Sequence, residues 1–385
     1  MSKIVIAIDS FKGCLTSTEV IQAAMEGVRQ TDPSCEVVPI PISDGGEGLL
    51  SSLSPIYDIK KRILSVHGPW MEAIRGEYGI SSDGKTAFIE MANVSGLPLV
   101  PKENRNPMLT TTYGTGELIH DALEQGCREF IVGIGGSATN DAGLGMLQAL
   151  GFRFLDKEGN ELGVGGEILG KVVHIDKSNI HPALADAHFT IACDVQNPFC
   201  GPEGAAYVFA PQKGATPEMV KILDEGMVSL SQTILSETGI DISNYPGAGA
   251  AGGLGGGFIA FLNAELKLGI QLILEALHFE EQIQGADFIL TGEGKMDRQT
   301  LMGKVPFGIL QAARKHRIPV IAIAGSIEDV ELLNQAGFQG VFSITPQPIS
   351  LEKAMEPTLA KKHIRQSVSQ ILALIRTAQN YIRPK

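Results

Sequence analysis

Five stretches of the chain combine glycine with acidic, basic or hydroxyl side chains, the residue types that hold and transfer a phosphoryl group. They are Asp9–Gly13, Ser43–Gly48, Gly133–Asp141, Gly247–Gly257 and Thr291–Lys304. Glycine lets backbone N–H groups approach a ligand, aspartate can hold Mg²⁺ or accept a hydroxyl proton, and lysine can neutralise phosphate charge. The combination predicts phosphoryl transfer, in which a protein mainly positions groups and balances charge. Neither spacing nor composition identifies the acceptor.

The stretch Gly133–Asp141 predicts an anion site. It follows the apolar run Phe130–Ile134, which indicates a buried strand, and precedes a helix with Leu144, Leu147 and Leu150 on one face. The expected capping residues of that helix are Thr139, Asn140 and Asp141. Unpaired amides and the dipole of a helix N-terminus both favour negative charge. A tight turn between strand and helix, without a ligand, is the alternative.

The stretch Thr291–Lys304 is the most highly charged of the five. It follows an apolar strand and holds Glu293, Lys295, Asp297, Arg298 and Lys304 in one expected loop. So many charges of both signs beside glycines favour a functional loop over a solvated, salt-bridged turn.

Asp194 directly follows another expected strand, Phe189–Cys193. An aspartate at the end of a strand is well placed to hold Mg²⁺ or to accept a proton from a substrate hydroxyl. The alternative is an aspartate that caps the turn at Asn197-Pro198. Lys213, in a nearby loop, is expected to be a solvated lysine.

Several common catalytic motifs are absent from the sequence. It contains no P-loop, no HExxH, no zinc-binding spacing of Cys and His, and no GxSxG. Gly247, Gly249 and Gly252 match GxGxxG, but Tyr245-Pro246 precedes them where a dinucleotide fold requires a strand.

The composition is typical of a soluble globular protein of about two domains, with 385 residues, 44% of them hydrophobic and 19% charged. A net charge of −12 argues against nucleic acid or an anionic membrane as a partner, because both bind through clustered Lys and Arg. The uncharged stretch between Asp241 and Glu265 is too polar and glycine-rich for a membrane span. Five cysteines without a CxxC pair, and no leader before Ile4, predict a cytoplasmic protein with free thiols.

The order of the expected elements predicts an α/β fold with two domains. Strands at Ile4–Ile8 and Val37–Ile40 are expected to join three late strands in one Rossmann-like or flavodoxin-like parallel sheet. The three late strands are Phe288–Thr291, Val320–Ala324 and Gly340–Ile344. This discontinuous domain would comprise residues 1–58 and 286–385. Residues 59–285, with an antiparallel meander, would form an inserted α/β domain, and the active site is expected in a cleft between the two.

The motifs themselves resemble those of the bacterial glycerate kinase family that lacks a P-loop. They are DSFKG at Asp9–Gly13, SDGGEG at Ser43–Gly48, GIGGSATNDAG at Gly133–Gly143, CDVQNP at Cys193–Pro198 and GEGKMDRQT at Gly292–Thr300. The resemblance runs from the first strand to the last helix. It implies phosphorylation of D-glycerate by ATP with Mg²⁺, with 2-phosphoglycerate as the product, and it implies a two-domain α/β fold.

Site roles follow from the resemblance and from position in the chain. Asp194 or Asp297 is expected to accept the glycerate hydroxyl proton, and the other, or Asp44, to lie near the metal. The expected cations against the carboxylate and γ-phosphate are Lys12, Lys295 and Arg298, with Lys12 and Lys295 counted as catalytic. Further expected substrate-binding residues are Asp9 and Asp44. The expected phosphate- or nucleotide-binding residues are Gly135, Gly136, Ser137, Asn140 and Glu293, and the expected metal ligands are Asp194 and Asp44.

Two other functions remain open at this stage. Phosphorylation of the 3-hydroxyl, or of another small hydroxy acid, would use the same loops. A non-catalytic sensor of a small anion would keep the glycine loops without needing aspartates at the strand ends. A homodimer is also left open. No motif points to a macromolecular complex.

Overall fold

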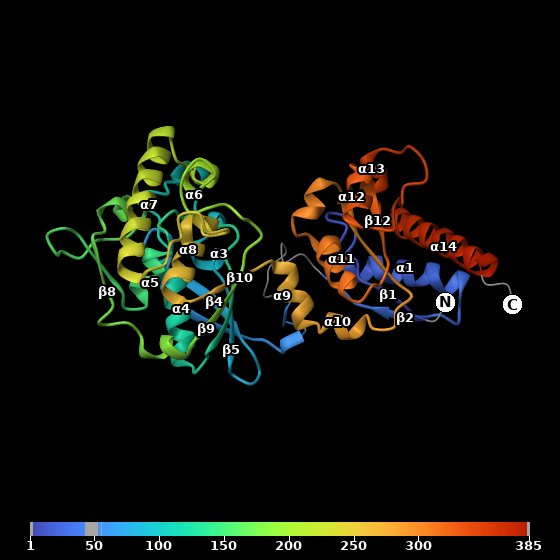
Figure 1. The fold of residues 1–385 in the computed structure, drawn as a ribbon, viewed down its shortest axis with the longest axis horizontal. Helices are drawn as coiled ribbons and strands as arrows, with labels where there is room; N and C mark the ends of the chain where they lie inside the picture. The colour runs from blue at the N-terminus through green and yellow to red at the C-terminus, as the bar shows by residue number, and fades with distance from the viewer. Residues whose placement is uncertain (1–2, 43–52, 55, 383–385) are drawn as a thin grey trace. The chain divides into compact units, whose positions relative to one another are not determined.

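The computed structural model describes residues 3–42, 53, 54 and 56–382, and its contacts divide the chain into two compact units (Figure 1). Unit 1 comprises Met1–Glu47 and Ile270–Lys385, and unit 2 comprises Gly48–Gly269. The mixed α/β fold class is as predicted.

Unit 1 is built on a parallel sheet whose strands come from both ends of the chain. The strands are β1 (Lys3–Ile6), β2 (Glu36–Pro39), β11 (Phe288–Met296), β12 (Val320–Ile327) and β13 (Gly340–Ser343). They lie in the order β13-β12-β11-β1-β2, and each neighbouring pair is parallel. Numbered within unit 1 alone, this is the flavodoxin-like order 2-1-3-4-5.

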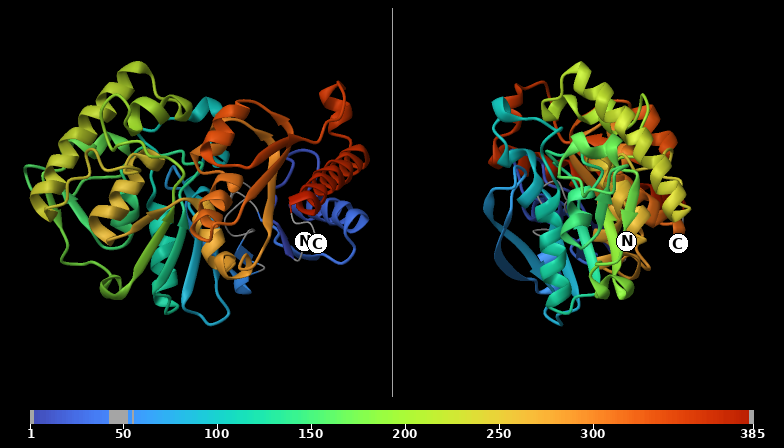
Figure 2. Two further views of the ribbon diagram at one scale, coloured as in Figure 1. Left: turned by 45° about the vertical axis from the view of Figure 1, so that its right-hand side comes forward. Right: turned by 90° about the vertical axis from the view of Figure 1, so that its left-hand side faces the viewer.

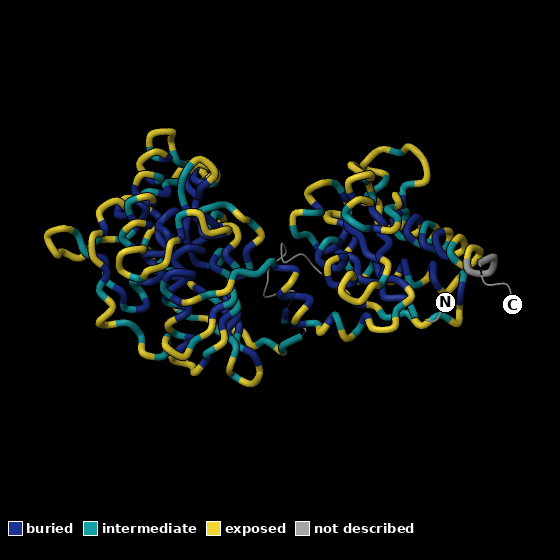
Figure 3. Tube along the Cα trace, in the orientation of Figure 1, coloured by how far each residue is buried: buried dark blue, intermediate teal, exposed yellow. Residues whose placement is uncertain are grey.

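Helices cover both faces of this sheet. On one face α1 (Ser17–Thr31) lies beside α14 (Pro357–Ile382), the blue and red helices that run side by side in Figure 2. Gly27 permits their close approach, because a Cβ atom there would lie 2.6 Å from the carbonyl oxygen of Arg365. The helix α11 (Val305–Lys315) packs against β11 and β12. The inner strands β1, β11 and β12 are therefore largely buried, whereas the outer strands β2 and β13 are not (Figure 3).

Short helices complete unit 1 at the ends of its strands. They are α9 (Gly269–Ala276), α10 (Phe279–Gln282), η6 (Arg298–Met302), α12 (Val330–Ala336) and α13 (Leu351–Ala354). Helix α1 begins at a capping box, in which the Thr16 hydroxyl accepts from the Glu19 amide and the Glu19 carboxylate accepts from the Thr16 amide.

The boundary between the domains differs from the one predicted at residue 285. Helices α9 and α10 belong to unit 1, because they pack against α11. Ile270 fills the space above Gly308, where a Cβ atom would lie 2.4 Å from Ile270 Cγ1, and Glu280 pairs with Lys315 at 2.6 Å. The boundary nearer the N-terminus was predicted at residue 58. The division of the chain by contacts falls between Glu47 and Gly48, which are outside the described residues.

Unit 2 contains a six-stranded mixed sheet in the order β10-β9-β6-β5-β4-β3. Its strands are β3 (Lys60–His67), β4 (Ala73–Ile80), β5 (Thr86–Glu90), β6 (Glu129–Gly133), β9 (His188–Ala192) and β10 (Glu265–Lys267). The first three form the predicted antiparallel meander, and β5, β6, β9 and β10 are parallel. A separate antiparallel pair joins β7 (Arg153–Leu155) to β8 (His174–Asp176).

Helices and 3₁₀ turns surround this sheet. The α-helices are α3 (Ala92–Ser95), α4 (Tyr113–Glu124), α5 (Leu144–Ala149), α6 (Ala205–Phe209), α7 (Pro217–Thr238) and α8 (Ala250–Leu262). The 3₁₀ turns are η1 (Leu97–Leu99), η2 (Lys102–Asn104), η3 (Gly166–Lys171), η4 (Pro182–Asp186) and η5 (Pro211–Lys213). No helix among the described residues is long and apolar enough to cross a membrane.

Packing accounts for the glycines of the stretch Gly247–Gly257, which contains the start of α8. A Cβ atom on Gly252 would lie 2.1 Å from the carbonyl oxygen of Thr139, and one on Gly249 would lie 2.1 Å from that of Pro198. Gly252 also has a positive φ of 70°. These glycines let α8 lie against neighbouring backbone, so no ligand is needed to explain them.

Candidate active site

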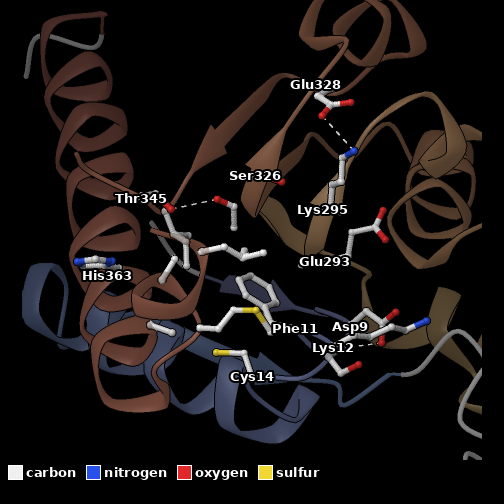
Figure 4. A pocket seen from close by; sticks show the side chains of 18 of the residues that line it. Asp9, Phe11, Lys12, Cys14, Glu293, Lys295, Ser326, Glu328, Thr345 and His363 are labelled. Carbon is white, nitrogen blue, oxygen red and sulfur yellow. Dashed lines mark hydrogen bonds and ion pairs between the residues drawn. The ribbon is translucent and has the colours of Figure 1, made fainter. Parts of the chain in front are cut away.

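Unit 1 contains a cavity of about 510 Å³ at the carboxyl ends of its strands. The segment after β1, the ends of β11 and β12, and the segment after β13 all contribute to its lining. The sheet order reverses between β1 and β11, and ligands bind α/β sheets outside the carboxyl ends of strands at such a switch point. Of the predicted site residues, Asp9, Lys12, Glu293 and Lys295 line this cavity (Figure 4).

Glu293 is the most buried acid of the predicted charged loop. Its Oε1 accepts a 2.7 Å hydrogen bond from the Thr300 hydroxyl, and its Oε2 lies 3.2 Å from Lys304 Nζ. The residue is 8% exposed, and this burial raises the pKa of Glu293 above its usual value. A buried carboxylate that holds a lysine at the cavity wall can fix the direction of that positive charge.

The prediction of a loop from Thr291 onward was wrong, because β11 continues to Met296. Lys295 and Met296 pair with Ser326 and Ile327 of β12, and this pairing keeps the segment after Thr291 in the extended conformation of β11. The period of two along a strand places Glu293 and Lys295 on one face, toward the cavity.

Lys295 is held by two carboxylates, as the dashed line in Figure 4 shows for Glu328. Its Nζ lies 3.0 Å from Glu328 Oε1 and 3.4 Å from Asp297 Oδ2. The Glu328 carboxylate is the main cause of the raised pKa of Lys295, so this lysine is a permanent cation at neutral pH.

Asp297 and Arg298 lie just beyond the strand and are not among the cavity-lining residues. Asp297 is the N-cap of η6, where its Oδ1 accepts from the Gln299 amide at 2.8 Å. Arg298 turns to Asp329, with 3.1 Å between Nε and Oδ2. Asp297 therefore contacts the cavity lining through its ion pair with Lys295, whereas Arg298 forms its ion pair with Asp329.

The segment after β1 contributes Asp9 and Lys12 to the cavity. The Asp9 amide donates to the Gly292 carbonyl oxygen at 3.0 Å, which ties this segment to β11, and the Asp9 side chain is buried. Lys12 is exposed. Figure 4 places Asp9, Lys12 and Glu293 on the same side of the cavity.

Asp194 lies in unit 2, exposed at the end of β9. Its Oδ1 accepts a 2.9 Å hydrogen bond from the Gly269 amide. The alternative prediction was that Asp194 caps the turn at Asn197-Pro198. The bond to Gly269 does not cap that turn. Asn197 instead donates to the Glu203 carbonyl oxygen at 2.8 Å.

The described residues offer no ready-made metal cage. Among them, no group of three or more His, Cys, Asp or Glu side chains could hold a metal ion, and the predicted ligand Asp44 lies outside them. Mg²⁺ commonly binds through one or two carboxylates together with substrate phosphates. The described carboxylates therefore fit an ion that arrives with a phosphate ligand.

The glycine loop after β6 presents two exposed residues, Gly135 and Gly136. Neither amide donates to an acceptor among the described residues. A Cβ atom on Gly135 would have no neighbour within 4 Å, so packing does not require glycine there. Exposed, unpartnered amides at the end of a strand suit an anion.

The predicted helix N-terminus beside this loop was wrong in detail. Helix α5 begins at Leu144, and its cap residue is Gly143 with a positive φ of 77°. Asp141 is fully buried, and its carboxylate accepts from both Thr112 donors and from the amides of Gly143 and Gly145. Those amides are therefore occupied by the protein itself.

Ser137 and Asn140, both predicted to bind phosphate, are buried. The Asn140 amide nitrogen donates to Met227 Sδ at 3.4 Å, and its Oδ1 is buried without a partner among the described residues. The exposed part of the loop is thus limited to its two glycines.

Lys213 was predicted to be a solvated lysine, but it is only 2% exposed, so that prediction was wrong. Its Nζ donates to Ser137 Oγ and to the Thr139 carbonyl oxygen, both at 2.7 Å. Burial lowers the pKa of Lys213 to about 7, against an opposing effect of the Asp141 charge. No local pattern in the sequence signals this burial, because the partners lie more than 70 positions away.

Comparisons with known proteins agree with the motifs. A sequence profile of the glycerate kinase family matches residues 4–376. The chain is 46% identical to a glycerate kinase of Halalkalibacterium halodurans, with 92% of this chain and 94% of that protein covered. It is 47% identical to the glycerate 2-kinase of Escherichia coli, with 91% and 93% covered. A crystal structure of a Salmonella typhimurium protein provisionally named glycerate kinase 2 matches with a TM-score of 0.82 at 41% identity, covering 98% and 99% of the chains.

Proposed function

The chain belongs to the glycerate kinase family, and from that membership we propose that it transfers the γ-phosphoryl group of ATP to the 2-hydroxyl of D-glycerate. The name of the Escherichia coli relative, glycerate 2-kinase, supports the choice of hydroxyl. Mg²⁺ bound with the ATP phosphates would neutralise charge that develops during transfer.

The observation that carries the proposal is the cluster of charges at the switch point of unit 1. Lys12, Lys295 and Lys304 all line the cavity, together with the carboxylates of Asp9, Glu293 and Glu328. Three ammonium groups match a triphosphate or a phosphate beside a carboxylate, because such ligands bring several negative charges.

Proton removal from the 2-hydroxyl requires a carboxylate, for which we propose Asp194 or Asp297. The glycerate oxygen would form a bond to the γ-phosphorus as the bond to the ADP oxygen breaks, and the proton would pass to the carboxylate. Both acids keep one oxygen in a hydrogen bond to a backbone amide, which fixes their orientation. Their assignment, and the predicted cleft between the domains, stay predictions.

The glycine loop of unit 2 has a proposed role in binding an anionic group of a substrate through the amides of Gly135 and Gly136. Lys213 would position this loop through Ser137. We also propose a cytoplasmic location, in keeping with the five free cysteines. Homodimer formation stays a prediction.

Purified protein incubated with D-glycerate, ATP and Mg²⁺ tests the proposal, with ADP release followed optically and the product identified by ³¹P and ¹H NMR. Phosphate on the 2-hydroxyl is expected. Phosphate on the 3-hydroxyl would correct the position of transfer. No turnover by a folded protein that still binds D-glycerate or ATP would favour the anion sensor.

A further inference from the structure

The cavity of unit 1 is larger than a small hydroxy acid requires. Cavities of this size accommodate ligands of drug or cofactor dimensions, whereas glycerate has only a three-carbon skeleton. The charged residues described above occupy only part of the wall. A second part of the lining therefore remains to be explained.

That second part is apolar. Its residues are Phe11, Cys14, Ile344, Leu351, Ala354, Met355 and Ala360. Met355 reaches across to the backbone of the segment after β1, since a Cβ atom on Gly13 would lie 3.0 Å from Met355 Cε. Apolar and sulfur-containing side chains pack well against a flat aromatic ring. The cavity thus has a charged part, in which lysines lie beside carboxylates, and an apolar part.

His363 of α14 supplies one polar group beside the apolar part. The residue is 7% exposed and lines the cavity. Figure 4 shows it on α14, across the cavity from Asp9 and Lys12. An imidazole that lines a cavity can exchange a hydrogen bond with a ligand there.

We propose that this apolar part, with His363, binds the purine base of the nucleotide donor, while the phosphates extend toward Lys12, Lys295 and Lys304. The inference rests on the proposed function, because it assumes that the donor is a nucleotide. Adenine combines an apolar face with ring nitrogens and an amino group at its edge. It therefore matches apolar walls with one buried hydrogen-bonding side chain.

The charge state of His363 is consistent with this role. Burial, helped by the nearby Lys362 charge, lowers the pKa of His363 below its ordinary value, so the ring is neutral at pH 7. A neutral imidazole offers one donor and one acceptor nitrogen to the edge of a base.

Cys14 and Cys35 provide a direct test, because they form a matched pair. Both are half-buried free thiols of unit 1, and burial raises the pKa of both, but only Cys14 lines the cavity. Alkylation rates of the two thiols would be measured by peptide mass spectrometry on the full chain, alone and with saturating ADP or inorganic tripolyphosphate.

We expect ADP to slow alkylation of Cys14 at least about fivefold and to leave Cys35 unchanged, with tripolyphosphate slowing Cys14 much less. The inference is overturned if saturating ADP leaves Cys14 unprotected, or if tripolyphosphate protects Cys14 as well as ADP does. Neither readout requires turnover. If ADP protects Cys14 in a protein that fails to phosphorylate D-glycerate, the proposed binding site for the base is supported and the proposed function is refuted. The two proposals can therefore fail independently.

A second measurement uses binding affinity. His363→Leu is expected to raise the Kd for ADP about tenfold without changing that for tripolyphosphate, and His363→Gln, which keeps hydrogen-bonding groups, should recover part of the loss. His316→Leu is the matched control, since His316 pairs with Glu280 and does not line the cavity. Equal affinities for ADP in the His363 variants and the wild type would count against the inference, provided that circular dichroism shows a folded protein.

Discussion

The side-chain nitrogen of Lys213 donates a 2.7 Å hydrogen bond to the hydroxyl oxygen of Ser137, 76 positions earlier in the chain. This bond ties the 3₁₀ turn η5 to the loop that follows β6. A buried lysine at the base of a glycine loop fixes where the exposed glycines lie, and it also makes the stability of the protein depend on pH.

Lys213→Met is expected to remove a pH-dependent part of the unfolding free energy. The folded-state pKa of about 7 lies below that of an unfolded lysine, so between about pH 7 and 10 the unfolded chain binds more protons. Wild-type stability should therefore rise with pH in this range, by up to about 1.4 kcal/mol per pH unit from this group.

Urea unfolding of wild type and variant at pH 7.5, 8.5 and 9.5 measures this difference. Lys221→Met serves as the control, because Lys221 is exposed on α7 and forms a surface ion pair with Glu225. Parallel stability profiles for wild type and Lys213→Met would show that the lysine does not titrate in this range.

Gly135→Ala separates folding from ligand binding in the glycine loop. The added methyl group would meet nothing within 4 Å, so the unfolding free energy should stay the same or rise by up to about 1 kcal/mol. If the Gly135 amide binds an anionic substrate group, the methyl group hinders that approach. The KM of one substrate should then rise about tenfold, which corresponds to about one hydrogen bond to a charged group.

Gly163→Ala is the matched control for this variant, because a Cβ atom on Gly163 also has no neighbour within 4 Å. Steady-state kinetics for ATP and D-glycerate would be compared for the two variants. Wild-type KM values in Gly135→Ala would exclude this amide from substrate binding.

Glu293→Gln removes the negative charge that holds Lys304 and should lower kcat/KM at least about tenfold. Because burial raises the pKa of Glu293, the wild-type acid limb of the pH–rate profile should lie above the pH expected for an exposed glutamate. The Gln variant should lack that limb. Glu331→Gln, at an exposed position of α12, should behave as wild type; an unchanged profile in Glu293→Gln would assign the acid limb to another group.

Asp194→Asn and Asp297→Asn distinguish the two candidates for the general base. Asparagine keeps an oxygen for the Gly269 amide in one case and for the Gln299 amide in the other, so both variants should fold. The variant that removes the base should lose roughly 10² to 10⁴ in kcat with little change in the Kd for D-glycerate. Asp241→Asn, at an exposed position, is the control. Near-wild-type kcat in both variants would move the base to another residue.

The sequence predicted the elements whose signals are local. The apolar run at Ile4–Ile8 corresponds to β1 (Lys3–Ile6), and the expected strand at Phe189–Cys193 corresponds to β9 (His188–Ala192). Periodicity within a short window fixes such elements, and the alternation of strands and helices along the chain fixes the parallel sheet.

The features that were missed depend on partners far away in the chain. The length of β11 is set by pairing of Lys295 with Ser326, and the burial of Lys213 is set by Ser137 and Thr139. A charged, glycine-containing stretch looks like a loop until a neighbouring strand pairs with it. The resemblance identified the family, but it could not show that Arg298 turns to Asp329 rather than to the cavity.

The strand order of unit 1 also bears on how the chain folds as it leaves the ribosome. Strand β1 lies between β2 and β11 in its sheet, and the Lys3 amide donates to the carboxylate of Asp287, 284 residues later. At roughly 5 to 20 residues per second, β1 waits on the order of 15 to 60 s for β11, whereas all strands of unit 2 are synthesised in between. Unit 2 can therefore fold first, and the apolar first strand must avoid aggregation until β11 has been synthesised.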